Sequence, residues 1–386
     1  MDNRDATDAR NIIYPSLVFP ISADYSISYV EILGYFISVI VKFISIVIGI
    51  FLACDYYNSG DFWFFLLTTL CIIIPGLITV YLSVYLYFED VQSKSRAQKS
   101  WYEFIFSLII MPFCFRYFQS LTYAILCKRA ELRYENEKQK HYFSLLVKED
   151  SDIVLIRLFE CYLEATPQKI LQIIIYLTKG QELRVLQGLS IFSSLTSITW
   201  CMASYYRCIR FAQPDKRPIS YKGSLFQCCW HFCVTVSRIT SICIIASIFL
   251  RWTLVAACIH AFLMSLWIFT FDRSPFCSKT CAHSMAFSIC LGFIYIFTYI
   301  SPREVNTKYR YIIYYTISGL ENLAAVILYC IFFPDNVLHF HTSVLLCVLS
   351  ISSFIVGIIF MMLYYQYYHP IITARQNMAV AQEPRF

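Results

Sequence analysis

The sequence predicts an all-α polytopic membrane protein with eight transmembrane helices and two re-entrant helices. Three observations predict this class: the composition, the length of the apolar runs and the placement of the basic residues. Of the 386 residues, 58% are hydrophobic and 15% are charged, and the mean hydropathy is +0.58. Soluble domains contain fewer apolar and more charged residues than this. Apolar runs near 20 residues are long enough to cross a bilayer as helices.

Ten apolar runs use most of the chain. They are residues 29–53, 62–88, 102–126, 153–178, 186–206, 224–249, 252–271, 284–300, 311–333 and 342–368. We therefore expect a cytosolic segment over 1–28, a membrane domain over 29–368 and a cytosolic tail over 369–386. The acidic start MDNRDATDAR has no basic segment before a short apolar core, so it does not resemble a cleaved signal peptide.

The distribution of Lys and Arg reduces the ten runs to eight crossings. Segment 127–152 has six of these residues, and it would face outside if run 102–126 crossed the membrane, against the positive-inside rule. The conflict disappears if run 102–126, with its central Pro112, is re-entrant. Basic residues also flank run 284–300 on both sides, so we expect this run to be re-entrant as well. Ten simple spans remain the alternative.

Run 153–178 carries side chains that are costly inside a bilayer. An ionised group at the centre of a membrane helix costs roughly 2.5–3.5 kcal/mol. At about 100° per residue, five polar side chains fall within an arc of about 120° and extend over roughly 22 Å. They are Arg157, Glu160, Glu164, Gln168 and Gln172. Lys169 lies at the margin of this polar stripe, and Pro167 is expected to kink the helix.

Charged residues in the other apolar runs also alternate in sign. Glu31 and Lys42 share one face of the first run, about 16 Å apart along its axis. Arg238 and Glu321 lie in two later runs. Alternating signs indicate pairing across helices. Such pairs either lock the bundle or line a hydrophilic track. A track of mixed sign suits a lipid headgroup as well as a small polar solute.

Four stretches resemble the XK-related family of membrane proteins. RLFECYLEATPQKILQ (157–172) is similar to the family signature R-L-F-E-x-x-L-E-x-x-P-Q-x-x-L-Q. The other three are SYYRCIR (204–210), LFQCCWHFCVTVSRI (225–239) and YIFTYISPREVNTKYRYIIYYTISGLEN (295–322). The similarity runs in order through about residues 28–335. It implies eight spans and two re-entrant helices, which is the topology predicted from the charges.

The resemblance implies a phospholipid scramblase of the plasma membrane, or a relative that docks partners without scrambling. Scrambling members move lipids, phosphatidylserine among them, between leaflets without ATP along a hydrophilic pathway. That role would fall here on Glu31, Lys42, Arg157, Glu160, Glu164, Gln168, Gln172, Arg238 and Glu321. Lys169 departs from the more usual apolar residue after Pro-Gln.

Some family members are activated when a caspase trims a terminus during apoptosis. The tail ITARQNMAVAQEPRF (372–386) contains no Asp, so it offers no such site. The start contains DATDA, in which Asp5 and Asp8 have the D-x-x-D spacing and a small residue follows. We therefore expect cleavage after Asp8 to release a restraint on the first span. KEDSD (148–152) is a weaker candidate, because cutting there would divide the core.

Two functions of other classes remain open. The first is a membrane scaffold that docks a lipid-transfer protein through residues 127–152 or 207–222. The second is a small-solute transporter. Expected partners are phospholipids, a caspase and a single-span accessory subunit or lipid-transfer protein, and no nucleic acid is expected. CCWHFC (228–233) and CSKTC (277–281) lack four ligands at zinc spacing, so we expect no metal or cofactor. No nucleophile-plus-base pattern is evident, so an enzyme is not expected.

Overall fold

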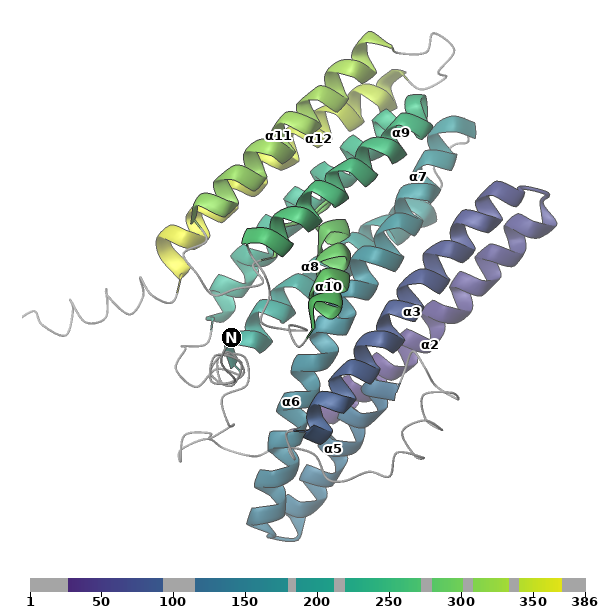
Figure 1. Cartoon of the computed structure of the whole chain (residues 1–386). Coiled ribbons are helices and arrows are strands. Elements are labelled where there is room, and N and C mark those ends of the chain that lie inside the picture. The colour runs from purple at the N-terminus through teal and green to yellow at the C-terminus, as the bar shows by residue number, and fades with distance from the viewer. Residues whose placement is uncertain are drawn as a thin grey trace, which may run out of the picture. The chain divides into compact units, whose positions relative to one another are not determined.

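The structure is a computed structural model that describes residues 27–92, 115–179, 185–211, 219–271, 280–300, 308–332 and 340–369. Every secondary-structure element within these ranges is helical (Figure 1). Five of the described helices are long and apolar enough to cross a membrane. These findings confirm the predicted all-helical membrane class. Asp8 and Pro112 lie outside the described residues.

The chain divides into two compact units at the junction of Glu160 and Cys161. The N-terminal unit contains the helices up to Glu160, and the C-terminal unit contains the helices from Cys161 onward. The N-terminal unit is built from α2 (Tyr29–Asn58), α3 (Phe62–Gln92), α5 (Phe115–Leu132) and α6 (Asn136–Glu160).

Helix α2 begins at a capping box. The Ser28 hydroxyl accepts from the backbone N–H of Val30, and the Glu31 carboxylate accepts from the backbone N–H of Ser28. These bonds satisfy donors that the first turn of a helix leaves free. At its other end α2 turns directly into α3, where Gly60 has a φ of 75° that favours glycine. The two helices therefore form an antiparallel hairpin.

Helices α5 and α6 form a second antiparallel hairpin, and the polar segment 127–152 is helical on both sides of its turn. Arg116 near the start of α5 contacts Asp152 in α6. Nearer the turn, the Cys127 thiol lies 3.6 Å from the Gln139 carbonyl oxygen. Helix α2 runs in the same direction as α6, because successive residues of α2 meet successive residues of α6, as described below.

The C-terminal unit packs around its longest helix. Helix α9 contacts α7, α10, α11 and α12. The elements are the π-helix η1 (Cys161–Ala165), α7 (Thr166–Lys179), α8 (Val185–Phe211), α9 (Tyr221–Phe271), α10 (Cys281–Ile294), α11 (Lys308–Ile331), α12 (Phe340–Leu363) and the π-helix η2 (Tyr364–Tyr368).

Helix α9 folds back on itself at Phe249, whose φ of −121° and ψ of 56° are not helical. A straight helix would separate Arg238 and His260 by about 33 Å, yet both side chains contact Glu321. The break falls at the last residue of apolar run 224–249, next to run 252–271, and the sequence predicts these two runs as separate spans. We call the two halves the first arm (221–248) and the second arm (250–271).

Helix α10 lies very close to the second arm. A Cβ added at Gly292 would lie 2.5 Å from the Ala261 carbonyl oxygen, which is closer than real Cβ atoms approach. The missing side chain therefore allows the two backbones to meet. This contact fixes the end of α10 beside the polar residues of the second arm.

Candidate functional site

The predicted pathway residues divide between the two units. Four of them, Glu31, Lys42, Arg157 and Glu160, lie in the N-terminal unit. The other five, Glu164, Gln168, Gln172, Arg238 and Glu321, lie in the C-terminal unit. Each group is described within its own unit.

Lys42 and Glu160 form an ion pair between α2 and α6. The Lys42 Nζ lies 3.1 Å from Glu160 Oε1, and the two side chains are only 9% and 8% exposed. A charge removed from water is tolerated when an opposite charge compensates it. The pair confirms that the alternating signs reflect pairing across helices, and it assigns the partner that the sequence could not.

Tyr117 of α5 links this pair to Arg157. Its hydroxyl donates to Glu160 Oε2 at 3.1 Å and accepts from Arg157 Nε at 3.4 Å. The Arg157 guanidinium also lies 5.2 Å from the centre of the Tyr117 ring, within the range of a cation–π contact. Lys42, Glu160, Tyr117 and Arg157 thus form a chain of polar contacts across three helices, which we call the α2–α5–α6 latch.

Glu31 has a different role in this structure. Its exposed side chain caps α2, as described above. Tyr35, one turn later on the same face, donates a hydrogen bond to Asp150 of α6. The sequence correctly predicts a shared polar face on α2, but Tyr35 and Lys42 are the members that reach α6.

A second buried cluster surrounds Arg116 in the N-terminal unit. One guanidinium nitrogen lies 3.0 Å from Glu149 and 3.1 Å from Asp152, and the other donates to the Ser83 carbonyl oxygen. All three charged side chains are at most 3% exposed. Because Asp152 is buried within a helix, the fold argues against KEDSD as a cleavage site.

Asp150 is a half-buried acid in the polar segment before apolar run 153–178. It accepts hydrogen bonds from Ser120 and Tyr35. Burial raises its pKa from the usual 3.8 to about 6, although the two hydrogen bonds oppose this shift. A raised pKa means that the folded chain holds the proton more tightly than the unfolded chain does. The resulting stabilisation is full below pH 3.8 and is lost as pH rises through about 6.

Replacing Asp150 with Asn should therefore raise the free energy of unfolding at pH 7.5 by about 3 kcal/mol, since one pKa unit is worth about 1.4 kcal/mol and the pKa rises from 3.8 to about 6. The gain should shrink as the pH falls from 6 to 4. Denaturant unfolding of purified wild type and variant across this range measures the difference. Glu137→Gln, at an exposed position of α6, is the matched control. An equal gain at every pH would contradict the assignment.

The helix that carries the polar stripe contains a π-turn at Cys161–Ala165. The Thr166 hydroxyl donates to the carbonyl oxygen of Cys161, five residues earlier. The uniform α-helical spacing used to place the stripe is therefore wrong across this turn, because a π-turn holds more residues than an α-turn. Pro167 is the second residue of α7, the helix that follows this π-turn.

The rest of the stripe lies in or beyond this π-turn. Glu164 lies within it, and Gln168 and Gln172 follow on α7, all half-buried. Lys169 donates to Gln172 at 3.2 Å. The residue that the sequence placed at the margin of the stripe is thus hydrogen-bonded to a member of it.

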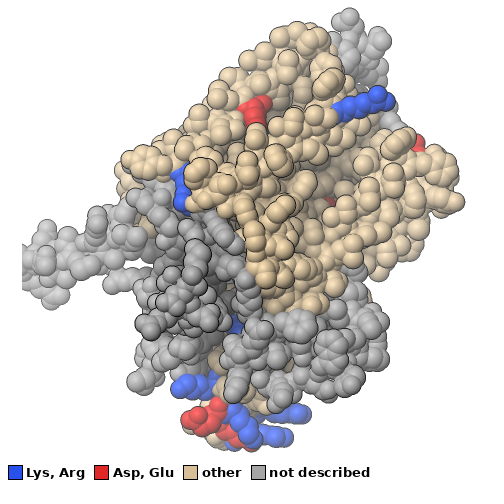
Figure 2. Space-filling model, in the orientation of Figure 1, with Lys and Arg blue, Asp and Glu red and all other residues tan. Residues whose placement is uncertain are grey.

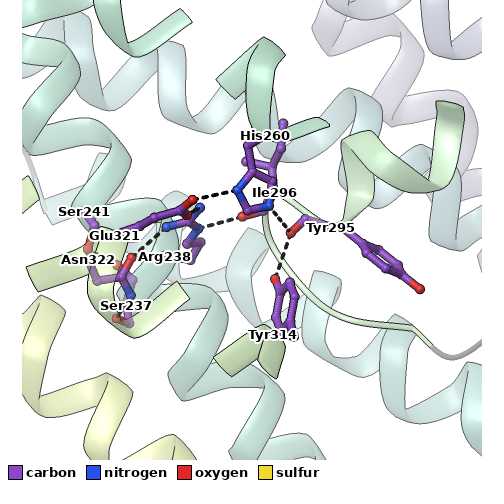
Figure 3. A network of polar contacts seen from close by, with 9 residues as sticks. All are labelled: Ser237, Arg238, Ser241, His260, Tyr295, Ile296, Tyr314, Glu321 and Asn322. Carbon is purple, nitrogen blue, oxygen red and sulfur yellow. Dashed lines mark hydrogen bonds and ion pairs between the residues drawn. The ribbon is translucent and has the colours of Figure 1, made fainter. Parts of the chain in front are cut away.

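Arg238 and Glu321 meet within the C-terminal unit (Figure 3). The Arg238 guanidinium contacts Glu321 and donates to the Asn322 side-chain oxygen at 3.0 Å. Its Nε donates to the Ile296 carbonyl oxygen at 2.6 Å. Asn322 in turn donates to the Ser237 hydroxyl. The side chains join the first arm, α11 and the segment after α10.

His260 completes this group from the second arm. Its Nδ1 lies 2.7 Å from Glu321, and its Nε2 lies 3.3 Å from the Tyr295 carbonyl oxygen (Figure 3). Neither His260 nor Tyr117 is among the residues predicted from the sequence. A lone histidine within apolar run 252–271 is a signal that could have found the first. Tyr117 is one of 30 tyrosines in the chain, so no feature of the sequence distinguishes it as a site residue.

In both units, oppositely charged side chains neutralise each other. A charged ligand can take the place of one partner in such a pair. Among the described residues, no group of three or more His, Cys, Asp or Glu side chains is arranged to hold a metal ion. The CCWHFC motif instead contributes Trp230 and His231 to an aromatic stack, with ring centres 4.3 Å apart.

Comparison with known proteins identifies the family. The model of the XK-related protein family matches residues 33–370, which is most of the chain. This chain belongs to the XK-related family. The resemblance inferred from the four sequence stretches is thereby confirmed.

Curated relatives include two nematode proteins. The chain is 27% identical to cell death abnormality protein 8 of Caenorhabditis elegans over 278 residues, covering 68% of this chain and 59% of that protein. It is 25% identical to the Caenorhabditis briggsae protein of the same name over 266 residues, covering 66% and 56%. The match therefore spans less than two thirds of the length of these relatives.

Proposed function

We propose that the chain is a phospholipid scramblase of the plasma membrane, with both termini in the cytosol. It would move lipids, phosphatidylserine among them, in either direction without ATP. The α2–α5–α6 latch carries the proposal. Charged side chains in membrane helices are costly and face a cavity, a partner or a pathway, and the latch places three of them together with a tyrosine. Membership of the XK-related family and the polar side chains of the stripe support the same function.

Charge exchange explains how such a site would act on lipid. In the closed state Lys42 neutralises Glu160. A phospholipid headgroup carries phosphate and, in most lipids, an amine, so it can offer an anion to Lys42 or Arg157 and a cation to Glu160. The buried charges stay compensated while a headgroup passes. Lipid binding and the opening of the latch are then coupled equilibria.

Helix directions in the N-terminal unit support a re-entrant run 102–126. Helix α3 runs opposite to α2, and α5 runs opposite to α6. Helix α6 runs in the same direction as α2. Helices α3 and α5 therefore both end on the side of the membrane where α2 begins. A single crossing by run 102–126 would place the end of α5 on the other side. The directions favour eight spans over ten.

Helix α10 supports a re-entrant run 284–300. Its 14 residues cover about 21 Å, less than the roughly 30 Å of a hydrocarbon core. It runs opposite to the second arm, since Gly292 meets Ser265 and Tyr295 meets His260.

The direction of α11 completes this argument. Helix α11 runs with the first arm, because Tyr311 lies beside Trp230 and Glu321 beside Arg238. Helices α10 and α11 therefore begin on the same side. A single crossing by run 284–300 would put the start of α11 on the opposite side.

Activation by a caspase is part of the proposal. The two relatives carry cell death in their names, and DATDA at the start of this chain has a caspase-like pattern. Asp8→Ala should abolish the increase in lipid exchange that caspase treatment gives the wild-type protein. Exchange is measured after reconstitution, with chain length checked on a gel. A variant that is still cut at this position, or activates fully without being cut, would contradict cleavage after Asp8.

Purified full-length protein in liposomes tests scrambling itself. Fluorescent phosphatidylserine is placed in both leaflets, and a membrane-impermeant quencher is added from outside. A scramblase lets the quencher reach nearly all of the label, whereas protein-free liposomes lose about half. No exchange, before or after caspase treatment, would reject the scramblase. A solute leak without lipid exchange would favour a small-solute transporter.

The α5–α6 hairpin favours a docking scaffold as the second candidate. Charged side chains gather at its end (Figure 2). Exposed Arg129, Arg133 and Lys140 and the 90% exposed Tyr134 lie there, and two Lys–Glu pairs neutralise other charges. A lipid-transfer protein would dock on this charged surface. A single-span accessory subunit would bind at another surface of the chain. Absence of lipid exchange in liposomes would favour this function.

A further inference from the structure

His260 has a hydrogen-bond acceptor on each side of its ring. Glu321 lies at Nδ1 and the Tyr295 carbonyl oxygen at Nε2 (Figure 3). A backbone carbonyl only accepts, and an ionised carboxylate only accepts. Glu321 also accepts from Arg238, as an ionised carboxylate does. Because a neutral imidazole has one N–H and an imidazolium has two, only the charged ring can donate to both partners.

The groups that face the ring come from three directions. Glu321 and Tyr314 lie on α11, Arg238 on the first arm, and Tyr295 directly after α10. A proton on His260 would be attracted by Glu321 and repelled by Arg238. Helices α10 and α12 contain no Asp, Glu, Lys or Arg, and Lys169 of α7 bonds to Gln172.

The carbonyl groups after α10 hold this segment in place. The Tyr295 carbonyl oxygen accepts from the Tyr314 hydroxyl at 2.9 Å as well as lying next to His260. The Ile296 carbonyl oxygen accepts from Arg238. The following amides close a turn, since Phe297 and Thr298 both donate to the Ile294 carbonyl oxygen. We call residues 295–298 the α10 turn.

We propose that His260 is a proton-binding site that clamps the α10 turn when charged and loosens it when neutral. Histidine is the side chain whose charge changes near physiological pH. The neutral ring keeps its hydrogen on Nδ1, because a bond to a carboxylate is stronger than one to a carbonyl group. The lone pair of Nε2 then faces the Tyr295 carbonyl oxygen. The loosening is therefore confined to the turn and leaves the contact with Glu321 intact.

The test uses the full chain in lipid nanodiscs and does not depend on scrambling. Nitrogen NMR of ¹⁵N-histidine distinguishes an imidazolium from each neutral tautomer. The His260 signal is recognised in the wild-type protein by its closeness to a glutamate carboxyl carbon. We expect both nitrogens to be protonated near pH 5.5 and Nε2 to lose its hydrogen by pH 8.5. A ring in one protonation state throughout this range would overturn the proposal.

Hydrogen–deuterium exchange tests the clamp. His260→Gln carries no charge at any pH, and His141→Gln, at an exposed position of α6, is the matched control. Relative to His260→Gln at the same pH, the wild-type α10 turn should exchange several-fold more slowly at pH 5.5 and lose most of this protection at pH 8.5. His141→Gln should behave as wild type. A wild-type turn whose protection does not change with pH would also overturn the proposal.

Discussion

Replacing Arg238 with Met should lower the free energy of unfolding by about 2–3 kcal/mol, because a buried guanidinium loses charge-assisted hydrogen bonds while its partner Glu321 is 37% exposed. The Arg238 side chain is 7% exposed and contacts Glu321, Asn322 and the Ile296 carbonyl oxygen. Without it Glu321 loses its ion-pair partner on the first arm. Loss of helical structure in mixed micelles with increasing sodium dodecyl sulfate measures the change.

Two control variants separate charge from packing in this experiment. Arg238→Met combined with Glu321→Met removes both charges and should recover most of the lost stability. Arg251→Met changes an exposed residue next to the break in α9 and should alter stability by less than about 0.5 kcal/mol. If Arg238→Met cost no more than Arg251→Met, the pair would not be a determinant of the fold.

Replacing Lys42 with Met should increase lipid exchange before any caspase treatment by about tenfold, which corresponds to about 1.4 kcal/mol. The change leaves Glu160 buried without its lysine, which destabilises the closed state. An open state, in which water or a headgroup reaches the carboxylate, is affected less. The liposome measurement with labelled phosphatidylserine gives the rate.

The double variant Lys42→Met with Glu160→Gln provides the decisive control. It removes the unpaired charge, so basal exchange should return toward the wild-type value while exchange after activation falls. Lys222→Met, at an exposed position near the start of α9, should leave both rates unchanged. Basal exchange that is as fast in the double variant as in Lys42→Met would show that the ion pair does not keep the latch closed.

Local signals predicted much of the fold from the sequence. Apolar length identified the long helices, and the short interval between two runs predicted the break near Phe249. Charge alternation predicted that Lys42, Glu160, Arg238 and Glu321 would be paired. It could not choose their partners, because the pairs join residues far apart in the chain.

Other parts of the site depend on tertiary contacts that periodicity does not contain. The π-turn at Cys161–Ala165 changes the spacing along the stripe, whereas a helical wheel assumes one spacing throughout. Tyr117 enters the latch through contacts 40 and 43 residues away in sequence. His260 meets a carboxylate 61 residues away. Tyr117 and His260 acquire their contacts only when the helices pack against one another.

The role of the polar stripe in lipid transport is tested most directly by Glu164→Ala in reconstituted, caspase-treated protein. We expect lipid exchange to fall by at least about tenfold relative to wild type, and we expect Arg157→Ala to have a similar effect. Glu137→Ala, an exposed position of α6, should keep the wild-type rate. Exchange in Glu164→Ala and Arg157→Ala at the wild-type rate would contradict a lipid route that uses these two side chains.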